Sequence, residues 1–125
     1  MNNAIKNAIQ KALSKYGTAE HLCSIENLKG EWEQHIATDS VQSTITSDLN
    51  LRHKLINQGR ILEENTDEHY YYWLLQLKGL FAPEALAVTI RDGTTVHIGI
   101  YVNDGLRSQK RALQGIEQMR TALLL

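Results

Sequence analysis

Four carboxylates and a downstream lysine are the residues whose types and spacing come nearest to catalytic chemistry. The carboxylates are Glu63, Glu64, Asp67 and Glu68, and the lysine closes the tripeptide Gln76-Leu77-Lys78. Acids on one strand could hold Mg²⁺ while a lysine on the next strand lies near an attacked phosphate, as in a metal-dependent nuclease. Gln76 stands where that arrangement places an acid, and no Pro-Asp pair supports it. A solvated acidic turn is therefore the competing interpretation.

The histidines and the cysteine form no recognisable metal or nucleophile motif. The five histidines lack the H-x₃-H and H-E-x-x-H spacings of zinc sites, and the single Cys23 follows Leu22 on an apolar stripe, where a thiol behaves as a small hydrophobe. No G-x-S-x-G elbow and no glycine-rich phosphate loop occur. We therefore predict no catalytic residue, no metal ligand and no cofactor.

Composition limits the class of protein. The chain has 125 residues, 42% of them hydrophobic, which is enough for a single domain over residues 1–125. Thirteen basic and 14 acidic residues give a net charge of −1, unlike the basic balance of a dedicated nucleic-acid binder. One cysteine excludes an intramolecular disulfide, and no window resembles a signal peptide or membrane span. We expect a cytoplasmic protein without a membrane partner.

A β-hairpin over residues 86–102 is the clearest structural element. Apolar side chains recur at every second position on both sides of the turn dipeptide Asp92-Gly93. We expect one face to point into the core, with Leu86, Val88, Ile90, Val96, Ile98, Ile100 and Val102. The opposite face then presents Ala87, Thr89, Arg91, His97, Gly99 and Tyr101.

A second hairpin is predicted from residues 60–64 and 70–78, joined by an acidic turn. The run Tyr70-Tyr71-Tyr72-Trp73 is rich in strand-forming aromatics, although a helix over residues 68–77 competes with this interpretation. If Tyr70 and Tyr72 share the face of Tyr101, they form a surface typical of protein-binding patches. The alternative is that the first helices cover this face as a second core layer.

Helices are expected before and after these hairpins. Residues 3–16 carry a stripe that Gly17 ends, and a second helix begins at Thr18 and keeps helical spacing to Ile36, with a break at Gly30. A third helix starts at Ser47 or Asp48, with Leu51, Leu55 and Ile56 inward, and ends at Gly59. The hydroxyl-rich residues 38–47 between them predict a loop, with a short strand over 41–46 as the alternative.

The last helix opens at residues 103–105. Asp104 is its expected N-cap, and its buried stripe is predicted to contain Leu106, Leu113, Ile116, Met119 and Leu123. The C-terminal Leu123-Leu124-Leu125 cannot all face one side, so we expect one of them to touch the sheet edge or a second copy of the chain. Monomer and homodimer both remain open. The predicted fold is α+β, with N-terminal helices, about four antiparallel strands in two hairpins, and a C-terminal helix packed on the sheet.

These observations favour a small non-enzymatic protein that sequesters or neutralises another protein, the type to which immunity proteins, antitoxins and secretion chaperones of bacteria belong. The expected partner is a basic toxin or effector, because acidic side chains steer a basic partner and tyrosine is enriched in interfaces. The predicted contact residues are Glu63, Glu64, Asp67, Glu68, Tyr70, Tyr72 and Tyr101.

The last helix offers a nucleic-acid-binding alternative. Arg107, Lys110 and Arg111 form a polar stripe with Gln114 that could meet phosphates or an acidic protein. A solvated outer helix face explains the same stripe.

Overall fold

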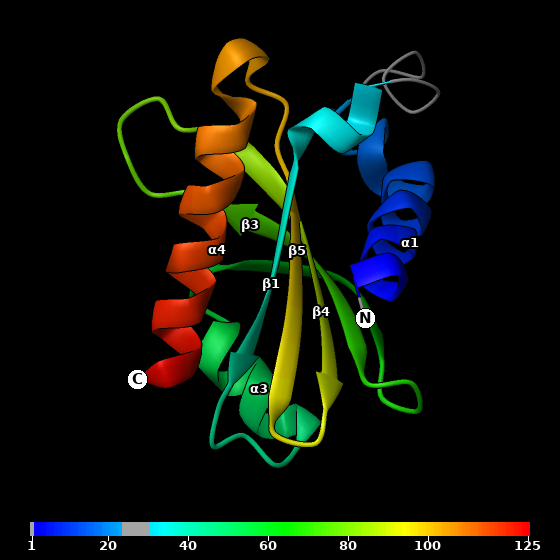
Figure 1. Ribbon diagram of the computed structural model, residues 1–125, viewed down its shortest axis with the longest axis vertical. Helices are drawn as coiled ribbons and strands as arrows, with labels where there is room; N and C mark the ends of the chain where they lie inside the picture. The colour runs from blue at the N-terminus through cyan, green and yellow to red at the C-terminus, as the bar shows by residue number, and fades with distance from the viewer. Residues whose placement is uncertain (1, 24–30) are drawn as a thin grey trace.

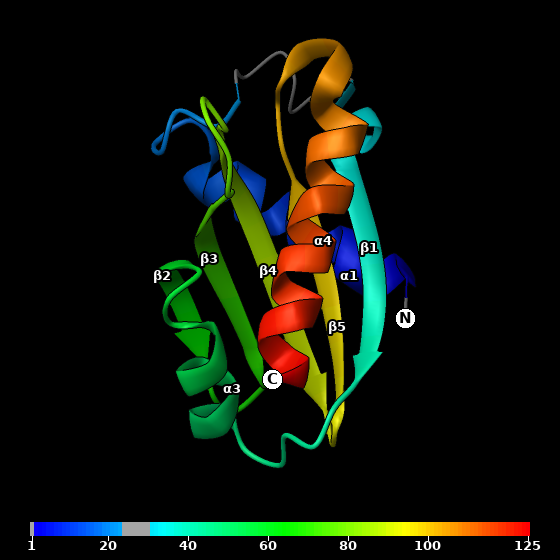
Figure 2. The same ribbon diagram turned by 90° about the vertical axis from the view of Figure 1, so that its left-hand side faces the viewer.

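An antiparallel sheet of five strands lies between helices on both of its faces (Figures 1 and 2). The computed structural model describes residues 2–23 and 31–125. Its strands are β1 (Ile36–Gln42), β2 (Gly59–Asn65), β3 (Tyr70–Gln76), β4 (Glu84–Asp92) and β5 (Thr95–Tyr101), in the order β1-β5-β4-β3-β2. Its longer helices are α1 (Asn2–Ala12), α3 (Asp48–Leu55) and α4 (Ser108–Leu124). The predicted α+β class is confirmed, with five strands in place of about four.

The additional strand is β1, which covers part of the segment predicted to be a loop. Its seven residues pair with β5, from Ile36 opposite Tyr101 to Gln42 opposite Thr95. Pairing along a full strand outweighs the local tendency of hydroxyl side chains to form turns. The loop prediction is therefore wrong for residues 38–42.

The predicted second helix is also wrong where the structure describes it. Residues 18–22 form turns, and Glu31–His35 form a short 3₁₀ helix, η2, that leads into β1. The intervening residues, including the predicted break at Gly30, lie outside the described residues. Gly17 ends η1 (Leu13–Gly17), a π-helical turn that continues α1. A Cβ at Gly17 would lie 2.5 Å from the Sγ of Cys23, so close packing explains this glycine.

The β4–β5 hairpin is confirmed, but its two apolar rows face opposite sides of the sheet. A two-residue turn at Gly93 pairs Asp92 with Thr95, so even-numbered residues of β4 lie opposite odd-numbered residues of β5. Paired residues share a face. One face carries Leu86, Val88, Ile90, His97, Gly99 and Tyr101, and the other carries Ala87, Thr89, Arg91, Val96, Ile98 and Ile100. The predicted single core row is therefore wrong, because turn length sets the register between the strands.

Each face has its own hydrophobic core. Helices α3 and α4 cover one face, where Trp73 and Ile98 are buried against Met119. Helix α1 packs on β4, β5 and β1 across the other face, where Ile5 and Ile9 meet Tyr101. A Cβ at Gly99 would lie 2.5 Å from Ile9 Cδ1, so glycine permits this close approach. The alternative left open by the sequence was that the first three helices cover one face as a second core layer; α1 does so, whereas α3 packs on the opposite face with α4.

Helix α3 begins as predicted, with Ser47 as its N-cap. The Ser47 Oγ accepts a hydrogen bond from the amide of Asn50 at 3.1 Å. Leu51 and Leu55 are buried, whereas Ile56 is exposed, contrary to the prediction.

Helix α4 packs through a stripe that differs from the predicted one. The predicted cap Asp104 makes no side-chain capping bond and precedes a 3₁₀ turn, η3 (Gly105–Arg107). Leu106 and Leu113 are exposed, so their assignment to the buried stripe is wrong. The residues buried along α4 are Ser108, Ala112, Gly115, Ile116, Met119, Ala122 and Leu123. Small residues replace leucine on this face because α4 lies close to β5, where a Cβ at Gly115 would be 3.0 Å from Ile100 Cγ2.

Candidate partner-binding groove

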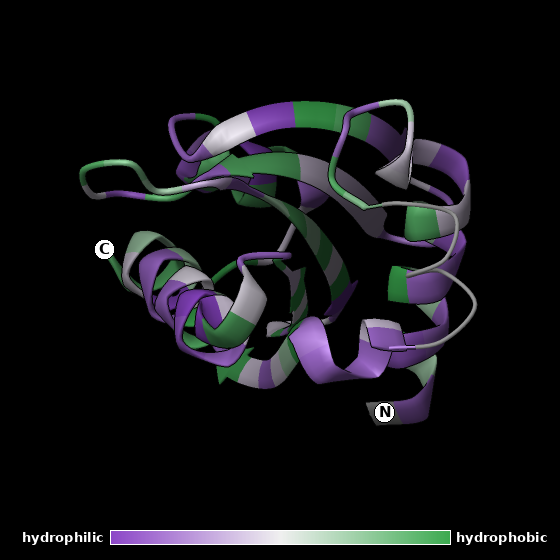
Figure 3. Cartoon of the chain, turned by 90° about the horizontal axis from the view of Figure 1, so that it is seen from above, coloured by the Kyte–Doolittle hydropathy of each residue, from purple (hydrophilic) through white to green (hydrophobic). Residues whose placement is uncertain are grey.

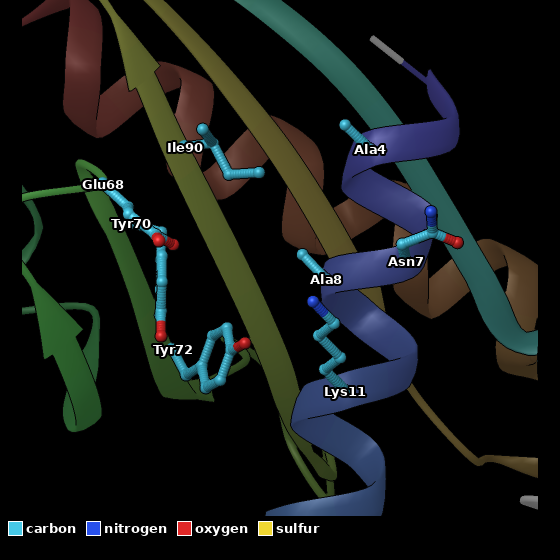
Figure 4. A pocket seen from close by; sticks show the side chains of 8 residues that line it. All are labelled: Ala4, Asn7, Ala8, Lys11, Glu68, Tyr70, Tyr72 and Ile90. Atoms are coloured by element: carbon cyan, nitrogen blue, oxygen red, sulfur yellow. The ribbon is translucent and has the colours of Figure 1, made fainter.

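A groove of about 420 Å³ lies beside α1, where that helix stops covering the sheet (Figure 4). We call it the α1–β3 groove. Its lining residues are Ala4, Asn7, Ala8, Lys11, Glu68, Tyr70, Tyr72 and Ile90. Three of them, Glu68, Tyr70 and Tyr72, belong to the contact set that the sequence predicted.

Small residues on α1 keep this groove open. Ala4 and Ala8 are one helical turn apart and face Tyr70, Tyr72 and Ile90 across the groove (Figure 4). The larger side chains of α1 point into the sheet instead, as part of the buried core. The large apolar side chains Ile5 and Ile9 thus pack on the sheet, and Ala4 and Ala8 lie beside the hollow.

Tyr70 and Tyr72 line the groove, and Tyr16 packs on Tyr72. Tyr70 and Tyr72 are stacked, with centroids 5.0 Å apart and an interplanar angle of 26°. Tyr16 meets Tyr72 edge to face at 6.1 Å and 75°. Offset-stacked and edge-to-face pairs are the favourable aromatic geometries, so the three rings stabilise one another.

Glu63 holds this tyrosine cluster from the next strand. Its Oε1 accepts hydrogen bonds from Lys15 and from the hydroxyl of Tyr16, the latter at 2.7 Å, and its Oε2 accepts one from Tyr70 at 2.9 Å. A β-bulge makes this possible, because Ile61 pairs with Trp73 and Glu63 pairs with Tyr72. The carboxylate thereby lies on the α1 side of the sheet.

The ionisation of the cluster follows from these bonds. The hydrogen bonds from Lys15 and then Tyr16 lower the pKa of Glu63, and the bond to that carboxylate raises the pKa of Tyr16. Burial, followed by the nearby Tyr70 and Glu63, raises the pKa of Tyr72 to about 12. At neutral pH Glu63 is therefore a charged acceptor, and the hydroxyl groups of Tyr16 and Tyr72 keep their protons.

The other predicted acidic residues have different surroundings. Glu64 lies 3.6 Å from Arg52 in a surface ion pair. Asp67 and Glu68 are exposed in the β2–β3 turn and form no ion pair with another described residue. Of the four carboxylates, these two are the ones available to steer a partner. Tyr101 is buried under α1 and lies outside the groove.

The candidate nuclease residues are not brought together. Glu63 pairs with Tyr72, and Gln76 and Lys78 follow at the opposite end of β3 from the acidic turn. Tyr72 and Lys78 are six positions apart along β3 and the two residues that follow it, a separation of roughly 20 Å for extended chain. Within residues 2–23 and 31–125, no group of three acids, histidines or cysteines is placed to hold a metal ion.

The basic stripe lies away from the groove, on α4 and η3. Arg107, Lys110, Arg111 and Gln114 line a separate hollow of about 290 Å³. Arg111 is bound to Asp104, with Nε 3.2 Å from Oδ2. The acidic turn and the basic stripe therefore belong to different faces.

Sequence reasoning missed a polar cluster that anchors the turn next to the groove. Asp48 at the start of α3 accepts a hydrogen bond from Arg91 Nε at 2.8 Å, and its other oxygen lies 2.8 Å from His69 Nδ1. Burial raises the pKa of Asp48, but the bonds from Arg91 and His69 outweigh it, and the pKa lies below its ordinary value. His69 follows Glu68 and has a positive φ of 59°, so the cluster fixes the backbone at the groove's acidic end. These residues are far apart in sequence, and only the fold joins them.

Comparison of the chain with protein-family models, with curated proteins and with solved structures gave no match. In the part of the chain that the structure describes, every helix is too short or too polar to span a bilayer.

Proposed function

We propose that this protein is a non-enzymatic binding protein that captures a partner protein, as immunity proteins, antitoxins and secretion chaperones do, and that the α1–β3 groove receives a segment of that partner. The observation that carries the proposal is the partly exposed Tyr70, which is stacked on the buried Tyr72 and lines a hollow next to alanines. Tyrosine supplies large contact area with a polar end, and such residues dominate binding energy in interfaces.

The groove is held in shape before a partner arrives. Glu63 fixes the hydroxyls of Tyr16 and Tyr70, and the rings of these residues pack on Tyr72. Side chains that are already ordered lose little conformational entropy on binding. This preorganisation supports a role in recognition.

The charges at the two ends of the groove indicate the partner's chemistry. Glu68 lies at the end near Ala4 and Ile90, and Lys11 lies at the end near Tyr72 (Figure 4). A segment with a basic residue, an apolar middle and an acidic or amide residue would match this order. The exposed Asp67 adds to the acidic end, in keeping with a basic toxin or effector as partner.

A photo-crosslinking residue at position 8 tests the proposal. In the producing cell, irradiation should attach one defined protein at this position, and the same residue at Gln10, on an exposed part of α1 outside the groove, should not. The purified partner then allows a direct measurement. Ala8→Trp, which fills the groove, should weaken its binding about tenfold or more, whereas Gln10→Trp should not. Equal affinity of both variants would rule out the groove as the contact surface.

A further inference from the structure

Two neighbouring apolar side chains stand almost free of the protein at the tip of the β3–β4 loop. Leu80 is 82% exposed and Phe81 is 91% exposed. The loop projects from the body beside α4 (Figures 1 and 3). Large apolar side chains that protrude side by side mark an interaction site in a folded protein.

This loop is fastened at its base. Its Lys78 amide donates to Gln118 Oε1 at 3.1 Å, and the Lys78 carbonyl accepts from Gln114 Nε2 at 2.5 Å. Phe81 has a positive φ of 59°, a backbone conformation that is costly for a bulky residue. The loop is therefore held at its base, while Leu80 and Phe81 protrude from its tip.

The outer face of α4 and η3 continues this surface. Leu106 in η3 and Leu113 in α4 are also exposed. The same two elements carry the hollow lined by Arg107, Lys110, Arg111 and Gln114. A Cβ at Gly79 would lie 3.9 Å from a guanidinium nitrogen of Arg111, so the loop and this hollow are neighbours.

The charge of this surface is basic. Lys78, Arg107 and Lys110 form no ion pair with any other described residue, and the charge of Arg111 is offset by Asp104. The acid on the same helix, Glu117, pairs with Arg120 at 3.6 Å. Lys78 at the base of the loop and Arg107 and Lys110 in the adjoining hollow are thus cations without an ion-pair partner among the described residues, next to the loop that carries Leu80 and Phe81.

We propose that this surface attaches the protein peripherally to an anionic membrane, with Leu80 and Phe81 entering the interfacial region and Lys78, Arg107 and Lys110 contacting lipid phosphates. Apolar insertion combined with basic residues is the combination that holds proteins on anionic lipid surfaces. A convex tip fits a deformable bilayer, whereas a protein partner would need a matching pocket. Such attachment needs no spanning helix, and it departs from the expectation that the chain has no membrane partner.

This surface and the α1–β3 groove lie on opposite faces of the sheet, because α4 and α1 cover opposite faces. A membrane-attached molecule would therefore keep its groove open to the solvent. The inference is independent of the proposed function, and each can fail without the other.

Vesicle sedimentation with the full-length protein tests the inference. At low salt the wild type should bind vesicles of phosphatidylcholine and phosphatidylglycerol and should not bind vesicles of phosphatidylcholine alone. Leu80→Ser with Phe81→Ser, and separately Arg107→Glu with Lys110→Glu, should each reduce binding about tenfold. The controls are Leu49→Ser on α3 for the loop variant and Lys6→Glu with Arg52→Glu for the charge variant, which alters the net charge by the same amount outside this surface. They should bind as the wild type does.

A second measurement follows the loop tip itself. In Phe81→Trp, the tryptophan emission gained over the wild type, which already contains Trp32 and Trp73, should shift to shorter wavelength with anionic vesicles and be quenched by brominated lipid. No binding by the wild type, equal binding to neutral and anionic vesicles, or normal binding by both loop and charge variants would overturn the inference. Failure to sediment combined with binding to an acidic protein through the same residues would assign the surface to a protein partner and also overturn it.

Discussion

Glu63 and Tyr72 lie opposite each other across the β2–β3 hairpin, and this register exists because Leu62 is an extra, bulged residue. Without the bulge, Glu63 would share the side of Ile61, which packs against the α4 core. With it, the carboxylate reaches Tyr16 and Tyr70 on the α1 side. The bulged Leu62 thus determines whether Glu63 can hold Tyr16 and Tyr70 beside the groove.

We predict that Glu63→Ala lowers the free energy of unfolding by about 1–3 kcal/mol, because two partly buried tyrosine hydroxyls lose a charged acceptor. Urea unfolding followed by circular dichroism measures the change. Glu64→Ala is the matched control, since its exposed pair with Arg52 contributes only about 0–1 kcal/mol. Similar losses in both variants would contradict the structural role of Glu63.

Lowering the pH should remove the contribution of Glu63 to the free energy of unfolding. Its pKa is lowered in the folded state, so its stabilisation is complete above the ordinary value of 4.5 and is lost as pH falls through the lower folded value. The difference in unfolding free energy between wild type and Glu63→Gln should therefore shrink as the pH is lowered from 7 to well below 4.5. A difference that stays constant over this range would show that the charge of Glu63 is unimportant.

We predict that Asp67→Lys with Glu68→Lys slows association with the partner roughly tenfold at low salt, with little change at high salt. These two acids are exposed and form no ion pair within the described residues. Their replacement should therefore change the association rate without changing the stability of the fold. Stopped-flow or surface plasmon resonance gives the association rate once crosslinking has identified the partner. Glu31→Lys with Glu33→Lys, on η2, changes the net charge equally away from the groove. An equal effect of both pairs would indicate that only net charge matters.

Acidification should destabilise the fold through His97. This side chain is buried, with Nδ1 2.7 Å from Ser40 Oγ, and burial lowers its pKa below 6.5. The unfolded chain therefore takes up a proton before the folded chain does, and stability falls as pH drops below about 6.5. The urea midpoint should decrease between pH 7.5 and 5.5 more in the wild type than in His97→Gln. The other four histidines are common to both proteins, so equal slopes would exclude His97.

We predict that Asp48→Ala lowers the free energy of unfolding by about 3–5 kcal/mol, because Arg91 is then left as a largely buried cation without its partner. The matched control is Asp92→Ala, an exposed acid at the end of the same strand as Arg91. Thermal and urea unfolding of both variants measure the difference. Asp48→Ala with Arg91→Met should recover most of the loss, since the double variant removes both charges. A loss in Asp48→Ala no larger than that in the control would contradict this account.

Hairpins and helix starts were predictable because their signals are local. The turn dipeptide at Asp92, the aromatic run from Tyr70 and the cap at Ser47 depend on residues close together in the chain. Strand β1 was missed because its stability comes from pairing with β5, which is more than fifty residues away. Leu113 was assigned to the core because helical spacing alone does not show which stripe of α4 faces the sheet, and Leu106 lies in the 3₁₀ turn before that helix.

The candidate site was predictable only in part. Tyr70, Tyr72 and Glu68 were found from composition and charge, and the groove contains all three. Its other wall comes from Ala4 and Ala8, which carry no chemical signal in the sequence. The role of Glu63 depends on a bulge, and bulges are decided by packing around the strand, so the residue was assigned to steering instead of to structure.

The two-residue connection at Gly93 has a consequence for how the chain tolerates insertions. In most surface loops an added residue alters the loop alone. Here a third residue would turn each side chain of β5 to the opposite face of the sheet. Gly99, which allows the close approach of α1, would then face α4, and Ile98 and Ile100 would face α1, where there is no space for them. The packing of both helical layers on the sheet would be lost together. The length of this turn is therefore as strict a requirement of the fold as any core side chain.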